Sequence, residues 1–220
     1  MVRAREALAA RTTMPSRPRG KYAASARSET RRAAILDAAL SVFAQGGFRS
    51  GSLREIAERV EMSEAGLLHH FDSKARLLAA VLDRRDELAH TMVPEHPNDG
   101  VLALKGLVQL ARFNASEPGV VELHCTLSAE ATSPSHPAHE YFVRRYESIR
   151  ETVRLAFADL SRRNLLNPGV DIDFATRATI AIMDGLQVQW LLDRSVLDLG
   201  DDVCRFLQGM TTADLSEASR

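Results

Sequence analysis

Residues 52–71 read SLREIAERVEMSEAGLLHHF, and apolar side chains recur at helical spacing on both sides of a tight turn in this stretch. Ser52 and Glu55 have the spacing of a capping box, which predicts that a short helix begins directly after Ser52. Ser63 can cap a second short helix, with Glu64 in its positive first turn. Two short helices joined by a tight turn have the dimensions of a helix-turn-helix.

A helix-turn-helix places its second helix in the major groove of DNA, which is wide enough to admit it. The side chains that face outward at the start of that helix should be small or polar, as are Glu64, Ala65, Gly66 and His69. Phosphates are expected near Ser52, His70 and Lys74. A carboxylate is repelled by phosphate but can accept from a cytosine amino group, so Glu64 either reads a base or only stabilises the helix N-terminus.

Helical periodicity continues on both sides of this stretch. From Thr30 an apolar stripe runs to Gly46-Gly47, where a helix is expected to end, and Asp72-Ser73 can cap a helix that extends toward residue 92. Proline and glycine breakers separate further helices, which are expected near residues 101–116, 119–131, 138–164, 172–195 and 201–210. Because strand signals are lacking, the sequence predicts an all-α fold of about nine helices.

The composition is that of a globular protein. Of the 220 residues, 45% are hydrophobic and 26% are charged, which is too apolar for wholesale disorder. No run approaches the ~18 apolar residues that span a bilayer, and the basic N-terminal stretch lacks the apolar core of a secretory signal. Two cysteines, Cys125 and Cys204, cannot form a disulfide framework. An intracellular, reducing setting without a membrane partner is therefore expected.

Charge is distributed unevenly along the chain. Residues 1–90 carry 16 Lys and Arg against 11 Asp and Glu, a net charge of +5, whereas residues 91–220 carry 12 against 18, a net charge of −6. A basic front half suggests a polyanionic partner. Residues 1–27 are basic and lack apolar periodicity, so a disordered basic arm is expected there. The arm either contacts DNA or is an inert tail, because Met14 could also be the initiator.

A set of residues over about positions 30–88 carries a family resemblance by its order and spacing. The set comprises Arg32, the run ILDAA at 35–39, Phe43, Gly47-Phe48, Ile56-Ala57, Ser63, Leu67, His70-Phe71, Ser73-Lys74 and Leu77-Leu78. In these residues the chain resembles the TetR (tetracycline-repressor) family of bacterial transcriptional regulators.

The resemblance implies two functional units: a helix-turn-helix DNA-binding domain over residues 28–74 and a helical ligand-binding and dimerisation domain over residues 75–220. It implies base contacts from Glu64, Ala65 and His69, on a surface that Ser63 and Gly66 share. It implies phosphate contacts from Ser52, His70 and Lys74, and Arg54 could make either kind of contact. Outside such a motif, His69 and His70 would be read as solvated or core histidines.

Three positions depart from the family pattern. Glu61 stands where a turn glycine is usual, and a left-handed backbone costs a non-glycine residue about 1–2 kcal/mol unless the turn is rearranged. Leu68 stands in place of a tyrosine, which removes one hydroxyl for phosphate. Ala65 stands where a glycine is usual, and Gly66 follows it.

The rear half resembles the family more weakly, in residues 127–132, 136–146 and 184–193. The helix expected at 177–195 is apolar on nearly all sides, so its own core and a second copy of the chain should both cover it. Gly185 and Gln189 are expected at that dimer interface, because close helix approach would explain a glycine in mid-helix. Candidate pocket residues, each of which could instead only pack in the core, are Phe113, Leu123, His124, Leu127, Tyr146, Met183, Gln187 and Trp190.

Other chemistries have weaker support. A metal site could draw on His124, Cys125, His136, His139 and Glu140, but Pro137 interrupts the pattern and no tetrahedral set is evident. No metal or other cofactor is therefore expected. Cys125 has no basic neighbour in sequence except His124, which argues against a redox sensor. No catalytic triad order or phosphate loop indicates an enzyme.

The sequence therefore predicts a DNA-binding transcriptional regulator. The leading interpretation is a homodimeric repressor on a pseudo-palindromic double-stranded operator, released by an unknown small-molecule effector. The alternatives are an activator or a regulator without a ligand and, more remotely, an architectural DNA binder with little sequence preference.

Overall fold

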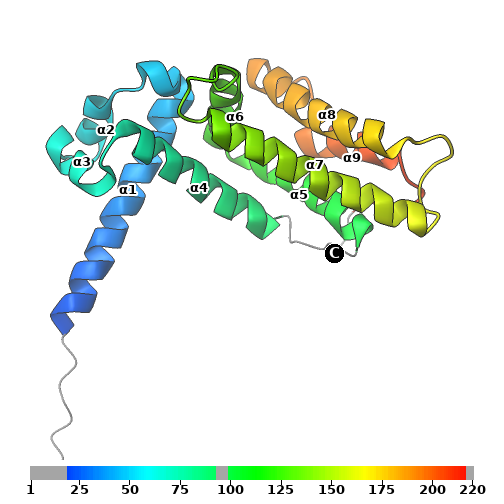
Figure 1. Cartoon of the computed structure of the whole chain (residues 1–220), viewed down its shortest axis with the longest axis horizontal. Coiled ribbons are helices and arrows are strands. Elements are labelled where there is room, and N and C mark those ends of the chain that lie inside the picture. The colour runs from blue at the N-terminus through cyan, green and yellow to red at the C-terminus, as the bar shows by residue number, and fades with distance from the viewer. Residues whose placement is uncertain (1–18, 93–98, 217–220) are drawn as a thin grey trace, which may run out of the picture.

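The structure, a computed structural model, describes residues 19–92 and 99–216, with side chains at residues 28–87, 89 and 99–216. Within these ranges the chain forms nine helices and no strand, so the predicted all-α fold is confirmed. The helices are α1 (Arg19–Ser50), α2 (Leu53–Arg59), α3 (Glu64–Phe71), α4 (Lys74–Met92), α5 (Gly100–Ser116), α6 (Pro118–Glu130), α7 (His139–Arg162), α8 (Ile172–Leu192) and α9 (Leu199–Gln208). Figure 1 shows α2 and α3 at one end of an elongated molecule and α5 to α9 gathered at the other.

The end that carries α2 and α3 is built around one apolar core. Phe43 of α1, Ile56 of α2, Leu67 of α3 and Leu77 of α4 are fully buried in it. Burial of large apolar side chains is the dominant favourable term in folding, so this core holds the two short helices in place.

The helix-turn-helix is set by local contacts. The Oγ atoms of Ser52 and Ser63 each accept a hydrogen bond from the backbone N–H three residues on, at 3.4 and 3.1 Å. Only half of the predicted capping box forms, because the Glu55 carboxylate pairs with Arg59 at 2.7 Å. Glu61 in the turn has φ 54°, so the left-handed backbone expected at this non-glycine position is present.

The other end has a second core, formed by α5 to α9. Leu104, Phe157, Leu160 and Leu207 are completely buried there, and Trp190 is nearly so. The helices of this end pack mainly as α5 on α9 and α7, and α8 on α7 and α9.

The domain boundary predicted at residue 74 falls at the start of α4, and packing is continuous across it. The first core continues along α4 to Leu82 and includes Leu123 and Leu127 of α6. The DNA-binding unit expected over 28–74 is thus packed directly on the rear helices, and α1 lies along α6.

The expected disordered arm, residues 1–27, differs from the structure at its end. Helix α1 begins at Arg19, so residues 19–27 are helical, and residues 1–18 lie outside the described residues. Ala23, Ala24 and Ala26 are strong helix formers, which explains how α1 extends beyond its apolar stripe. The first turns of α1 project from the body of the molecule (Figure 1).

Gly47 interrupts α1 close to where the sequence predicted its end. Its φ of 68° and ψ of −175° belong to a region that is essentially restricted to glycine. A Cβ at this position would lie 2.4 Å from Oε1 of Glu130 in α6. The same carboxylate accepts a hydrogen bond from the backbone N–H of Phe48 at 2.8 Å, which ties the end of α1 to α6.

We expect Gly47→Ala to lower the free energy of unfolding by more than the ~1–2 kcal/mol that a left-handed backbone costs an alanine, because the new methyl group also displaces Glu130 from Phe48. Gly169→Ala is the matched control, since Gly169 has φ 83° but no atom within 4 Å of its added Cβ. Urea denaturation of both variants measures the difference. Equal losses would contradict a role for Glu130.

Candidate nucleic-acid interface and internal cavity

Helix α3 presents a short polar face at the tip of the molecule. Glu64, Ala65 and His69 are exposed, whereas Leu67 and Phe71 are buried beneath them. This is the division expected of a helix that packs on its own core and offers its other face to DNA.

The N-termini of the two short helices are accessible. Ser52 at the start of α2 and Ser63 at the start of α3 are exposed. Gly66 is half-buried, and a Cβ there would come within 3.3 Å of Met62 and Ser63, so a larger residue would crowd the start of α3. Free backbone N–H groups at such termini bind phosphate oxygens.

The predicted phosphate-binding cations differ in how freely they are presented. The Arg54 side chain is 77% exposed and pairs with Glu58 at 2.8 Å, an exchangeable surface ion pair. Lys74 is half-buried: its Nζ donates to the Arg49 carbonyl at 3.2 Å and lies 4.7 Å from the centre of the Phe48 ring. Burial lowers the pKa of Lys74.

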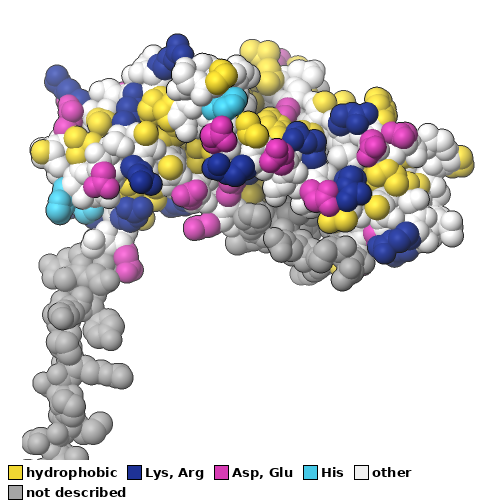
Figure 2. Space-filling model, in the orientation of Figure 1, with side chains coloured by type: hydrophobic (Ala, Val, Ile, Leu, Met, Phe, Trp, Pro, Cys, Tyr) yellow, Lys and Arg dark blue, Asp and Glu magenta, His cyan; other side chains and the backbone are white. Residues whose placement is uncertain are grey.

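His70 is half-buried, with its ring centre 6.1 Å from that of the exposed His69. Two further cations at this end were not among the predicted DNA contacts, although Arg32 belongs to the set that carries the resemblance. Arg31 donates to the carbonyl of Val60 in the turn at 3.1 Å, and Arg32 lies 4.3 Å over the Phe71 ring. The adjacent arginines one turn before the first buried residue of α1 were the available signal. At this end of the molecule, basic, acidic and histidine side chains are mixed on the surface (Figure 2).

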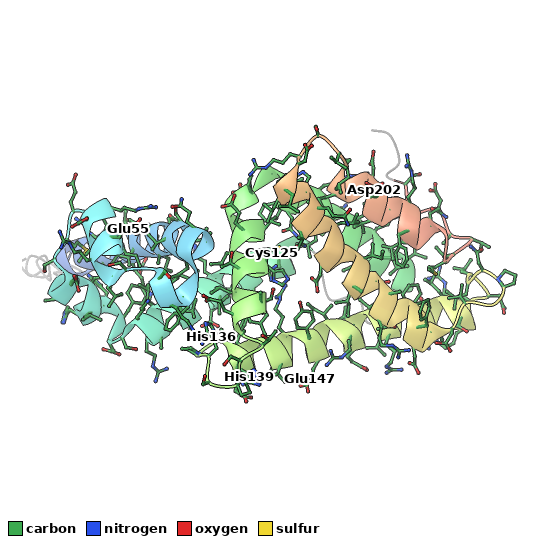
Figure 3. The ribbon with its side chains drawn as sticks, turned by 90° about the horizontal axis from the view of Figure 1, so that it is seen from above. Glu55, Cys125, His136, His139, Glu147 and Asp202 are labelled. Atoms are coloured by element: carbon green, nitrogen blue, oxygen red, sulfur yellow. The ribbon has the colours of Figure 1, made fainter. Side chains whose placement is uncertain are left out.

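The rear helices line a partly open cavity of about 210 Å³. Helices α6, α7 and α8 run along three sides of this region when seen from above (Figure 3), and α4 and α5 complete its wall. The lining residues on α4 are Arg85, Asp86 and Ala89. Leu107, Ile149, Val153, Ile180 and Met183 are among its apolar lining residues.

Asp184 of α8 anchors one polar group in this cavity. Its Oδ1 lies 3.2 Å from Nε2 of His124 in α6, and its Oδ2 accepts from the Tyr146 hydroxyl of α7 at 2.8 Å. Burial opposes ionisation of Asp184, but the hydrogen bonds from His124 and Tyr146 hold the pKa of its carboxyl below the usual range. Burial lowers the pKa of His124, so a neutral imidazole donates to the carboxylate.

Asp86 of α4 anchors a second polar group. Its Oδ1 accepts from Arg145 of α7 and from the adjacent Arg85, the latter at 3.3 Å, and its Oδ2 accepts from the Tyr141 hydroxyl at 2.7 Å. Burial raises the pKa of Tyr141 to about 12, so the hydroxyl remains protonated and donates. This group connects α4 directly to α7.

The eight residues that the sequence predicted as candidate pocket lining lie in different parts of the structure. His124, Tyr146, Met183 and Gln187 line the cavity. Phe113 lines a different hollow, of about 320 Å³, between α1, α4 and α5. Three residues of the expected set line neither space, because Leu123 and Leu127 are buried in the first core and Trp190 in the second: their positions correct the prediction. Sequence reasoning did not place the charged residues Arg85, Asp86 and Arg145 in the pocket.

The residues expected at a dimer interface lie on an open side of α8. Gln189 is exposed, and no atom lies within 4 Å of a Cβ added at Gly185. On α8, Phe174, Ile182, Val188 and Leu192 are also exposed apolar residues.

The residues considered for a metal site have other partners. His139 Nδ1 lies 2.8 Å from the Ala131 carbonyl, and His136 Nδ1 accepts from the backbone N–H of Ala138. Figure 3 places both histidines near the start of α7, away from Cys125 on α6. Among the described residues no group of three or more potential ligands could hold a metal ion. Burial raises the pKa of Cys125 to about 11, which disfavours a reactive thiolate.

Within residues 19–92 and 99–216, no helix is long and apolar enough to cross a membrane.

The buried neutral His124 predicts a pH dependence of stability. Because its pKa is lowered in the folded protein, the unfolded chain binds more protons as pH falls through about 6.5, and stability should be lost there. Urea denaturation from pH 7.5 to pH 5.5 should show a steeper loss for the wild type than for His124→Gln, which cannot titrate but can still donate to Asp184. Parallel losses would contradict a buried neutral His124.

Two sequence families match the chain in consecutive regions. Residues 35–81 match a model of "Bacterial regulatory proteins, tetR family", and residues 110–207 match "BetI-type transcriptional repressor, C-terminal". The probable regulator ArpR and the regulator TtgR, both of Pseudomonas putida, are each 30% identical over 200 residues, covering 86% of this chain and 94% of the relative. The fold is similar to that of NalD, the secondary repressor of the MexAB-OprM multidrug efflux pump in Pseudomonas aeruginosa, with a TM-score of 0.63, 22% identity, and coverage of 84% and 98%. The chain belongs to the TetR family of transcriptional regulators.

Proposed function

We propose that this protein is a homodimeric repressor that binds a pseudo-palindromic operator and leaves it when a small molecule occupies the cavity. The position of α4 carries the proposal. Its first turns contribute Leu77 and Leu78 to the core that holds α3, and its later turns contribute Arg85, Asp86 and Ala89 to the cavity wall. A ligand that moves one end of α4 therefore moves the other.

The proposed DNA-reading surface is the exposed face of α3. Glu64, Ala65 and His69 would contact base edges, while Ser52 and Lys74 would contact phosphates on either side. The protein would act in the cytoplasm, where a bacterial operator lies. The similarity of residues 110–207 to the C-terminal region of a transcriptional repressor favours repression over activation.

Release by a small molecule needs only a modest energetic bias. A ligand that prefers the non-binding spacing of the two α3 helices by a few kcal/mol shifts the population away from DNA. The cavity supports this step because its lining combines apolar side chains with polar and charged groups that could orient a small molecule.

The exposed apolar face of α8 supports a dimer. Leu192 is 82% exposed, Phe174 61% and Val188 48%, and by their helical spacing these residues share a face of α8 with Gly185. A two-fold axis through this face would bring two copies of α8 together and would match the symmetry of the operator.

Selection of bound sequences from random duplex DNA tests the proposed DNA binding. The enriched sequence should be a two-fold-symmetric motif with half-sites one helical turn or a small multiple apart. An architectural DNA binder would enrich no motif, and that outcome would sink the proposal.

His69→Ala should cost about 1–3 kcal/mol of binding free energy on the selected sequence and relax selectivity at one base position. Lys74→Met keeps the apolar stem over Phe48 but removes the charge, so it should weaken selected and random DNA alike and lower the salt slope by about one unit. Fluorescence anisotropy titrations at several salt concentrations measure both effects. The assignment of His69 to bases fails if both variants lose equally on both DNAs.

Gly185→Arg should convert the dimer to a monomer and abolish high-affinity operator binding. Open space surrounds this position within one copy, so the monomer can accept the larger side chain, whereas a partner helix would bury an unpaired charge. Leu102→Arg is the control, because Leu102 is an exposed apolar residue on α5, outside the proposed interface. Sedimentation velocity measures the oligomeric state; a dimeric Gly185→Arg with normal DNA affinity would place the interface elsewhere.

A further inference from the structure

Two buried cations share one carboxylate at the α4 side of the cavity. Arg85 is 7% exposed and the Arg145 side chain 13%, and both contact Oδ1 of Asp86. Burial and the nearby charge of Arg145 lower the pKa of Arg85, the expected effect of two crowded cations. Within the cluster of Arg85, Arg145 and Asp86 the positive charges outnumber the negative by one, and Asp184 on the α8 side balances the charge of the cavity as a whole.

Both carboxylates of the cavity already accept hydrogen bonds, whereas one buried donor lacks an acceptor. Asp86 already accepts from Arg85, Arg145 and Tyr141. The second carboxylate in the cavity, Asp184, already accepts from the neutral His124 and from Tyr146. By contrast, the buried Nε of Arg145 has no hydrogen-bond partner.

A second unpartnered atom belongs to a residue that lines the same cavity. Gln187 of α8 is 7% exposed and lines the cavity, and its buried Oε1 accepts no hydrogen bond. A buried polar atom without a partner is costly, so a ligand that supplied an acceptor to Arg145 and a donor to Gln187 would remove two such costs at once.

We propose that the effector is a small carboxylate with a single ring, whose anionic group binds Arg145 in exchange for Asp86. This inference rests on the proposed ligand-released function and names the ligand class. An enclosed apolar cavity of about 150 Å³ holds one benzene ring, so this partly open cavity of about 210 Å³ has room for at least one substituted ring. The apolar lining packs on the ring, and a hydroxyl opposite the carboxylate donates to Gln187.

The exchange connects the ligand to α4. Arg145 of α7 holds α4 through Asp86, and a ligand carboxylate offers the same guanidinium a charge-assisted partner. Asp86 keeps its contacts with Arg85 and Tyr141, so no carboxylate is left unpaired. Helix α4 loses one of its attachments to α7 and can shift.

Four carboxylates serve as probes: benzoate, phenylacetate, 4-hydroxybenzoate and 4-hydroxyphenylacetate, each compared with its primary amide by calorimetry on the full chain. At least one carboxylate should bind about tenfold or more tightly than its amide, because only the carboxylate forms a charge-assisted pair. If none of the four carboxylates binds more tightly than its amide at millimolar concentration, the proposal is overturned. This comparison needs no variant.

Variants locate the carboxylate. Arg145→Gln should abolish the preference for acid over amide, and Arg154→Gln, an exposed arginine of the same helix paired with Glu151, should keep it. Asp86→Asn should bind the carboxylate several-fold more tightly, because the competing charge is gone. Unchanged binding in Arg145→Gln or weaker binding in Asp86→Asn contradicts the exchange.

Operator binding separates this inference from the proposed function. A carboxylate that binds through Arg145 without releasing the selected DNA would refute ligand release and leave the ligand class intact. Release of DNA by the amides but not by the acids would refute the ligand class and leave the repressor function intact.

Discussion

The packing of α1 against α6 is the contact on which the relation between the two halves of the molecule depends. Leu123 and Leu127 of α6 are buried in the same core as Phe43 of α1 and Leu67 of α3. Glu130, at the end of α6, also accepts the backbone N–H of Phe48. Close-packed interiors deform little, so this side of the molecule is the fixed one. Helix α3 packs on α2 and α4, so the rear helices position it through the core that they share with α1 and α4.

The second attachment of the DNA-binding end is partly polar. Helix α4 reaches α7 through Asp86, Arg145 and Tyr141 beside the cavity, and both helices also contribute to the first core, α4 with Leu82 and α7 with Phe142. Hydrogen bonds and ion pairs can exchange partners at small net cost, whereas an apolar core cannot be opened without creating a void. The two attachments therefore differ in degree: α1 meets α6 mainly through the apolar core, whereas the contact of α4 with α7 adds ion pairs and hydrogen bonds that a polar ligand can rearrange.

Much of this architecture could be predicted from local sequence, and the misses have a common origin. Ser52, Ser63 and Gly47 act within a few residues of themselves, so the spacing in the sequence revealed the helix ends that they set. The Asp86–Arg145 pair joins residues 59 apart, and no local pattern states which charges meet. Leu127 and Trp190 looked like pocket residues because periodicity identifies a buried face but not which of two cores or a cavity it meets.

The free energies of these polar contacts have the size that a ligand-controlled conformational switch needs. A hydrogen bond to a charged group contributes about 1.5–3 kcal/mol net, and a shift of a few kcal/mol is enough to change which state of a two-state protein predominates. Removing a partner from a buried ion pair outright would cost about 3–5 kcal/mol, because it leaves a charge without compensation. In the proposed exchange Arg145 always has a carboxylate, first that of Asp86 and then that of the ligand, while Asp86 retains Arg85 and Tyr141. Each of these buried charges keeps a partner at both stages, so the free energy of ligand binding remains available to move α4.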